Sequence, residues 1–126
     1  MKLEKELIRK ILLAIEAHDG SPYDGVSLEF DDHSERQVGY HVMLLVEAGY
    51  VVGEDVGCLG DDLVWEAQRL TFLGHEFLDT IRDAEVWRRT KDAAGKVGSV
   101  SLSVLVEIGK AYAKQVLVER TGIVLP

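Results

Sequence analysis

Hydrophobic residues at the N-terminus recur every three or four positions, and charged residues fill the positions between them. The series comprises Leu3, Leu7, Ile8, Ile11, Leu12 and Ile15. This spacing is typical of one face of an amphipathic helix. Because Asp and Gly favour helix ends, the helix is predicted to stop near His18, Asp19 and Gly20.

The pattern then changes from the period of a helix to that of a strand. Residues 21–24 form a polar turn with one of the two prolines, and VSLEF (26–30) alternates apolar and polar residues like a short, half-buried strand. The polar stretch DDHSERQ (31–37) supplies capping residues for a second helix, VGYHVMLLVEAGY (38–50). That helix is predicted to end at Gly49, since a residue without Cβ suits a left-handed C-terminal position.

Residues 50–70 predict a β-hairpin. The apolar segments YVVGEDV and LVWEAQRLTF flank a glycine-rich acidic loop, GCLGDD. Thr71 is predicted to cap the helix that follows. This helix places Leu73, Phe77, Ile81 and Ala84 on one face and runs until the polar stretch 92–99; a last helix extends from about Ser99 to Arg120.

The order helix, short strand, helix, hairpin is the pattern of a winged-helix domain with the hairpin as its wing. We therefore predict an α+β fold in which residues 1–70 form a winged-helix-like core and residues 71–126 add two C-terminal helices. A chain of 126 residues fits a single domain, 1–126, that buries roughly two-thirds of the surface its unfolded chain exposes.

Charge and cysteine content narrow the functional classes. The net charge is −8 and is unevenly distributed, with five basic and fifteen acidic residues in 1–66 but nine and seven in 67–126. Cys58 is the only cysteine, so an internal disulfide and a cysteine-based zinc site are excluded, and we interpret it as a turn residue. No apolar run approaches the roughly 18 residues of a membrane helix. We expect a cytoplasmic protein without membrane contact.

Three blocks of the chain resemble a known family. They are LIRKILLAIE (7–16), HVMLLVEAGYV (41–51) and RLTFLGHEFLDTIRDAEVWRRTK (69–91). Together they are similar to a family of uncharacterised bacterial and prophage-encoded proteins, a domain of unknown function with the signature RLTxxGHEFLDxIRDxxVW. The resemblance implies a winged-helix-like domain with extra C-terminal helices, no established activity, no catalytic residues and no cofactor.

A winged-helix fold raises the question of DNA binding, which the second helix would carry. At about 100° per residue, one face is predicted to enter the core and the opposite face to contact a partner or DNA. The core face comprises Val38, His41, Val42, Leu45 and Ala48, and the outward face Arg36, Tyr40, Met43 and Glu47. Of the outward set, Arg36 can pair with guanine or phosphate, and Tyr40 can add a hydrogen bond or stacking.

The charges around this face disfavour duplex DNA. Asp31, Asp32 and Glu35 flank Arg36, and the hairpin tip GEDVGCLGDD carries four acidic residues and no basic one. Phosphate contacts dominate affinity for DNA and require cations. Residues 31–37 also leave too little chain for the first helix of a helix-turn-helix.

Basic residues gather instead after the hairpin, and two interpretations of them stay open. The cluster comprises Arg82, Arg88, Arg89, Lys91 and Lys96. Arg88 and Arg89 are candidate contacts to a partner or to DNA phosphates; alternatively, the cluster complements the dipole of a helix C-terminus.

The histidines do not predict a catalytic or metal site. His18-Asp19 and Asp31-Asp32-His33 contain metal-ligand residue types, but neither forms an i, i+4 pair on a regular helix. His41 is predicted to be a core residue with one nitrogen hydrogen-bonded. His75 is predicted to pair with Asp79 on the outer side of its helix, while Gly74 allows close packing. No nucleophile accompanies His75, so we predict no enzyme.

The last helix carries a wider apolar surface than one face of a small domain usually needs. Its main stripe comprises Val97, Val100, Val104, Ile108, Tyr112 and Val116. Part of the stripe is expected to pack on the first helix and Trp87. The rest, at Val104, Ile108, Tyr112 and Val116, is a candidate two-fold dimer contact.

Two functional hypotheses follow. The first is a non-enzymatic protein-interaction or regulatory module that binds a protein partner, or itself as a homodimer, through the hairpin and last helix. The alternative is a dimeric DNA-binding transcriptional regulator, with Arg36 and Tyr40 near the groove and the basic cluster on the DNA backbone.

Overall fold

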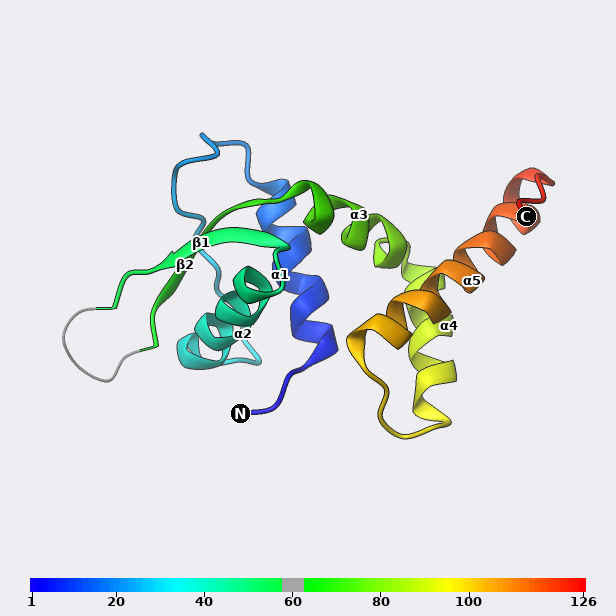
Figure 1. The fold of residues 1–126 in the computed structure, drawn as a ribbon, viewed down its shortest axis with the longest axis horizontal. Coiled ribbons are helices and arrows are strands. Elements are labelled where there is room, and N and C mark those ends of the chain that lie inside the picture. The colour runs from blue at the N-terminus through cyan, green and yellow to red at the C-terminus, as the bar shows by residue number, and fades with distance from the viewer. Residues whose placement is uncertain (58–62) are drawn as a thin grey trace. The chain divides into compact units, whose positions relative to one another are not determined.

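The computed structural model of the chain describes residues 1–57 and 63–126 (Figure 1). In these residues the fold is α+β, with five helices and one two-stranded antiparallel sheet. The chain divides into two compact units, Met1–Glu76 and Phe77–Pro126. The first unit ends inside a helix, six residues beyond residue 70, where the winged-helix-like core was predicted to end. The prediction that residues 1–126 form a single domain stays a prediction.

The first unit packs two helices against a hairpin. Its elements are α1 (Lys5–Ala17), α2 (Glu35–Glu47), β1 (Val51–Asp55), β2 (Trp65–Leu70) and the first half of α3 (Phe72–Ile81). Helix α1 contacts α2 and β2, while α2 contacts both strands. The fully buried core includes Leu7, Ile8, Ile11 and Leu12 of α1, Val42 and Leu45 of α2, and Ala67 of β2. The predicted core faces of both helices are confirmed except at their ends, where Leu3 and Ala48 are exposed.

A capping box starts α2 three residues earlier than the apolar pattern predicted. The Ser34 hydroxyl accepts a hydrogen bond from the Gln37 amide at 3.1 Å, and the Gln37 side chain accepts one from the Ser34 amide at 2.9 Å. This reciprocal pair satisfies two amides that a helix start otherwise leaves without partners. The predicted end is confirmed, because Gly49 has a φ of +83°.

The predicted strand at residues 26–30 is wrong. Only Val26 pairs with the hairpin, through an isolated antiparallel bridge in which its amide donates to the Ala67 carbonyl at 2.8 Å. The physical reason is the turn that follows: the His33 amide donates to the Phe30 carbonyl, and the chain bends there to reach the cap at Ser34. Segment 27–31 therefore leaves the edge of β2.

The single helix predicted after Thr71 is also wrong, because two helices occupy this region. Helix α3 ends at Ile81 and α4 (Ala84–Gly95) begins after Asp83, whose extended backbone and carboxylate cap the new helix. The carboxylate accepts from the amides of Glu85 and Val86 at 2.9 and 3.0 Å. The apolar face changes direction at this break, so Leu73 and Ala84 are exposed, whereas Phe77 and Ile81 are buried as predicted.

The start of α3 is held against the end of α2. The Thr71 hydroxyl accepts from the Gly74 amide at 3.0 Å, which confirms the predicted cap, and donates to the Gly49 carbonyl at 2.6 Å. A Cβ at Gly74 would fall onto the carbonyl oxygen of Tyr50. The predicted close packing at Gly74 is thus confirmed.

The second unit is built on a helix pair. Helix α4 packs against α5 (Leu102–Thr121). The buried residues of this pair are Val86, Trp87, Thr90, Ala94, Leu105, Gly109 and Val116. Helix α5 begins after the cap Ser101 and ends at Gly122, which has a φ of +76°. Its observed bounds lie within three residues of the predicted ones. No helix in the described parts of the chain is both long and apolar enough to cross a membrane.

Candidate interaction surfaces

The outward face of α2 presents the four residues expected there. Arg36 and Glu47 are exposed, and Tyr40 and Met43 are half-buried. The Tyr40 ring meets the His41 ring edge-on, with centroids 5.9 Å apart and planes at 84°. The face thus combines one cation, one anion and two half-buried side chains, a tyrosine and a methionine. Such a composition suits contact with a protein as well as with a nucleic acid.

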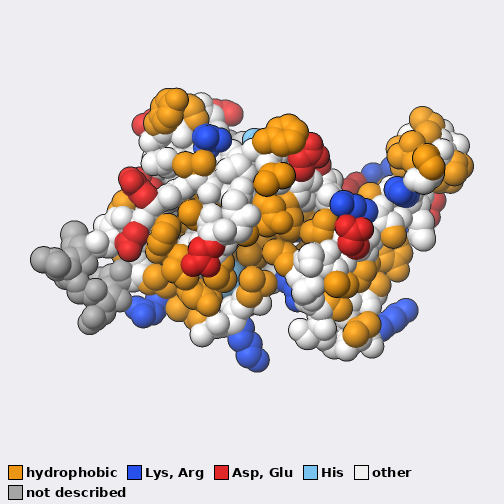
Figure 2. All heavy atoms as spheres, viewed as in Figure 1, with side chains coloured by type: hydrophobic (Ala, Val, Ile, Leu, Met, Phe, Trp, Pro, Cys, Tyr) orange, Lys and Arg blue, Asp and Glu red, His pale blue; other side chains and the backbone are white. Residues whose placement is uncertain are grey.

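The charges of the first unit are strongly biased. Residues 1–76 contain six basic and sixteen acidic residues, a net charge of −10. On the hairpin, Glu54 and Asp55 of β1 are exposed, and the Arg69 guanidinium donates to the adjacent Leu70 carbonyl at 3.2 Å. Of the predicted acidic tip, Asp61 and Asp62 fall with Cys58 in residues 58–62, outside the described residues. Figure 2 shows acidic side chains distributed over this unit.

The arginines of the basic cluster are held in ion pairs within the second unit. Arg88 contacts Glu85 at 2.6 Å and Asp92 at 3.3 Å, while Arg89 contacts Glu85 at 2.8 Å and forms a two-point pair with Glu119 at 2.9 and 3.0 Å. These hydrogen bonds, Arg88 first and then Arg89, lower the pKa of Glu85 to about 2. Basic and acidic side chains lie next to each other on this unit in Figure 2.

Two further basic side chains of this unit are engaged as well. Arg120 contacts the Asp83 carboxylate at 2.7 Å, and this hydrogen bond is the largest cause of the lowered pKa of Asp83. The Lys91 ammonium lies 5.8 Å from the centre of the Trp87 ring, a cation–π distance. Phosphate contacts here would have to compete with pairs inside the protein.

The apolar stripe of α5 is divided between core and surface. Val116 is 4% exposed and packs inside the helix pair, so it offers no surface to a second copy, contrary to its assignment as a dimer contact. Val104 is 46% exposed, and Ile108 and Tyr112 are half-buried. Val104 and Ile108 line a shallow hollow on the helix together with Ser103, Glu107 and Ala111. The prediction of a dimer contact now rests on Val104, Ile108 and Tyr112.

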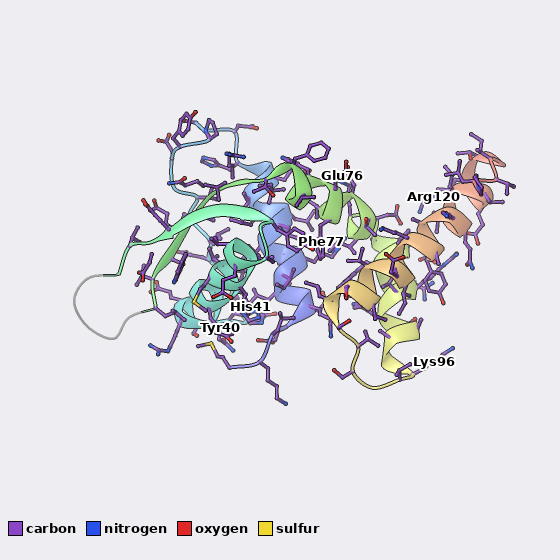
Figure 3. All side chains as sticks on the ribbon, in the orientation of Figure 1. Tyr40, His41, Glu76, Phe77, Lys96 and Arg120 are labelled. Atoms are coloured by element: carbon purple, nitrogen blue, oxygen red, sulfur yellow. The ribbon has the colours of Figure 1, made fainter. Side chains whose placement is uncertain are left out.

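His41 is a structural residue. Its side chain is fully buried where α2 faces the start of α1 (Figure 3), and both ring nitrogens are hydrogen-bonded. Nε2 accepts from the Glu4 amide at 2.8 Å, and Nδ1 donates to the Gln37 carbonyl at 2.7 Å. The sequence analysis predicted a hydrogen bond at only one of these two nitrogens. The bond from Glu4 satisfies the backbone amide of the N-cap residue of α1.

The predicted pair of His75 with Asp79 is not formed in the described part of the chain. Its side chain is exposed, and Asp79, its predicted partner, accepts instead from Arg82 at 3.0 Å. Within the described residues, no group of three His, Cys, Asp or Glu side chains is placed to hold a metal ion.

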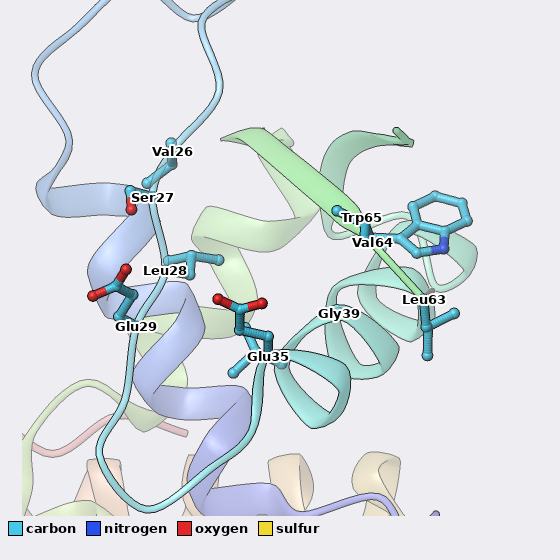
Figure 4. A pocket seen from close by; sticks show the side chains of 10 residues that line it. Val26, Ser27, Leu28, Glu29, Glu35, Gly39, Leu63, Val64 and Trp65 are labelled. Carbon is cyan, nitrogen blue, oxygen red and sulfur yellow. The ribbon is translucent and has the colours of Figure 1, made fainter. Parts of the chain in front are cut away.

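The structure adds a groove that sequence reasoning missed. A hollow of about 230 Å³ lies between segment 26–29, the first half of α2 and residues 63–65; we call it the Glu35 groove. It adjoins a second hollow of about 350 Å³ on the His33 side, and both share Leu28, Glu29, Glu35 and Val38. In Figure 4 the Glu35 carboxylate points between segment 26–29 and β2. Only the alternation of VSLEF, which turns Leu28 inward, signalled any part of this groove.

Comparisons with known proteins place the chain among uncharacterised relatives. A family model described as "Hypothetical protein (DUF2513)" matches residues 2–101. An "Uncharacterized protein" of Haemophilus influenzae (strain ATCC 51907 / DSM 11121 / KW20 / Rd) is 31% identical over 118 residues, which cover 93% of this chain and 99% of the relative. No solved structure matches.

Proposed function

Because the chain belongs to the family of hypothetical proteins DUF2513, whose description states no activity, we propose a function from its surfaces: a non-enzymatic, regulatory protein-interaction module. Its first unit would act as a winged-helix-like domain. The order α1, Val26 bridge, α2, hairpin supports this assignment. Helix α2 then occupies the place of a recognition helix, and the hairpin that of a wing.

The observation that carries the proposal is the sign of the charge where a winged helix would meet DNA. Arg36 on α2 is accompanied by exposed Glu47, Glu54 and Asp55 in a unit of net charge −10. A duplex places one negative charge about every 1.7 Å along its axis. Approach of such a surface to DNA would be repulsive, whereas a basic protein surface would be attracted.

The arginines of the second unit support the same choice. Arg88 and Arg89 are engaged by Glu85, Asp92 and Glu119. A phosphate would have to displace a carboxylate before it could bind either guanidinium, so the gain from the new contact would be reduced by the loss of the old one.

The structural use of one buried histidine and one hydroxyl supports the proposal of a non-enzymatic role. His41 has both nitrogens hydrogen-bonded inside the core, and the Thr71 hydroxyl caps α3. Neither group is available as a base or nucleophile at a surface.

DNA binding by a dimer is the second candidate, because Arg36 and Tyr40 do lie on the outward face of α2. A mobility-shift titration of the full chain with a random duplex pool at several salt concentrations separates the two. We expect no shift at about 150 mM salt and micromolar protein. Nanomolar binding that weakens steeply with salt, and that is lost in Arg36→Ala but kept in Arg88→Ala, would replace the proposal with a DNA-binding function through α2.

A further inference from the structure

We propose that the Glu35 groove binds an extended segment of a protein partner through one lysine or arginine side chain and the free edge of β2. This inference rests on the proposed function and specifies the partner's chemistry. The pairing pattern of β2 gives the first argument for it.

The edge of β2 away from β1 is partly covered. Val26 pairs with Ala67, and Gly39 of α2 lies against the backbone of residues 63–65. A Cβ at Gly39 would fall onto the Leu63 carbonyl oxygen and lie 3.6 Å from the Trp65 amide nitrogen. The Trp65 carbonyl lies in the part that remains.

Val64 receives a hydrogen bond from the Val56 amide at 2.9 Å, so Val64 faces β1. In an antiparallel pair, successive residues alternate between facing the partner strand and facing away. Trp65, opposite Asp55 in the register, therefore turns its amide and carbonyl away from β1, as does Ala67.

Segment 26–30 begins to use this edge and then leaves it. Val26 donates to the Ala67 carbonyl, and continuation of the antiparallel register would place Leu28 opposite Trp65. No such pair forms, and the Glu35 groove opens between these two residues instead. Figure 4 shows the segment running away from the strand at this point. An extended segment from a partner can hydrogen-bond to a strand edge of this kind.

The lining of the groove defines the side chain that fits. Leu28 and Val38 supply apolar contacts, and the exposed Glu35 supplies a carboxylate. The Glu29 carboxylate lies on the other side of the segment in Figure 4, so Glu35 is the principal acid inside. A lysine or arginine combines an aliphatic stem with a cationic end and matches both parts of this lining.

The charge around the groove favours a basic partner segment. Glu29, Asp31 and Glu35 add an attraction for such a segment, while Asp32 is already paired with Lys10 at 3.3 Å.

His33, in the adjoining hollow, has one buried ring nitrogen that makes no hydrogen bond within the described residues. Its side chain is 9% exposed, and Nε2 lies 3.3 Å from the Glu4 carboxylate. Nδ1 is the nitrogen without a partner in the described part of the chain. The second hollow therefore contains a polar group that the described part of the chain does not satisfy.

The test is an NMR titration of the ¹⁵N-labelled full chain with a seven-residue peptide in which valine and lysine alternate, at about 150 mM salt. We expect amide shifts concentrated at Leu28, Gly39 and Trp65. Glu35→Gln should weaken binding at least about fivefold, because the charge-assisted hydrogen bond to the lysine is lost. Glu76→Gln, at an exposed position of α3 in the same unit and outside the groove, should leave binding unchanged.

Two control peptides test whether the lysine charge is required for binding. Peptides that replace lysine by glutamate or serine should bind at least about fivefold more weakly. Equal shifts with the glutamate peptide, equal loss in both glutamine variants, or absence of groove shifts would overturn the groove. Duplex DNA that shifts the outward face of α2 would instead overturn the proposed function, so the two failures are distinguishable.

Discussion

Replacement of His41 tests whether this histidine is structural. Its side chain is fully buried and links the start of α1 to α2 through the Glu4 amide and the Gln37 carbonyl. His41→Phe keeps an aromatic ring but removes both hydrogen bonds. At about 1 kcal/mol for each bond, and with the Glu4 amide left without its partner, we expect a loss of about 2–3 kcal/mol in the free energy of unfolding.

His41→Ala adds a cavity to this loss. Truncation of a large buried side chain costs about 2–5 kcal/mol, so His41→Ala should be destabilised further than His41→Phe, by about 3–5 kcal/mol in total. His75→Ala is the matched control. Because its side chain is exposed on α3, its effect should stay within about 0.5 kcal/mol.

The assay is urea unfolding in a Trp87→Phe background. Trp65 then reports on the unit that contains His41, whereas Trp87 belongs to the other unit. A shift in the midpoint at unchanged slope measures stability. If both His41 variants unfold within about 0.5 kcal/mol of the parent protein, the two hydrogen bonds do not hold α1 to α2.

Three further outcomes are expected. Gly74→Ala should lose about 1–3 kcal/mol in urea unfolding because its Cβ would meet the Tyr50 carbonyl, whereas Gly95→Ala, with open space around it, should not be destabilised; equal effects would contradict the close packing. The pKa of Glu85 is lowered to about 2, so the stability that its ion pairs provide is present above about pH 4.5 and is lost as the pH falls towards 2; thermal melts of Glu85→Gln should approach wild type over that range, and a constant difference would refute the pairing. Light scattering should show a dimer that Val104→Asp dissociates, and a monomeric wild type would exclude the contact.

The sequence predicted those elements whose signals are local. The apolar series of α1, the polar cap before α2, Gly49 and the Thr71 cap each depend on residues within one or two helical turns, and all are confirmed. The hairpin was equally evident, because two apolar segments flank a glycine-rich loop.

The two wrong predictions, the strand at 26–30 and the single helix after Thr71, concern segments whose local sequence pattern fits more than one structure. VSLEF has the alternation of a strand, but the turn at 30–33 draws the chain towards Ser34. Asp83 lies inside a helical pattern, yet its carboxylate caps a new helix and Arg120, 37 residues later, secures it. Neither the turn nor the contact with Arg120 could be predicted from the few residues around each segment.

The candidate surfaces also divide into features that depend on local sequence and features that depend on tertiary packing. The outward face of α2 followed from helical periodicity alone. The ion pair of Arg89 with Glu119 and the burial of Val116 depend on how α4 packs on α5, and the Glu35 groove depends on where segment 27–31 leaves β2. These arrangements are tertiary, so residue type and spacing could not predict them.

Site-specific photo-crosslinking in the native cell tests the central claim most directly. A photoreactive amino acid would replace Met43 on the outward face of α2, with Lys96 of the second unit as the control position. We predict that the Met43 adduct is digested by protease and resists nuclease, because a protein occupies this face. A nuclease-sensitive adduct at Met43 would contradict the account and identify the module as a DNA-binding or RNA-binding protein.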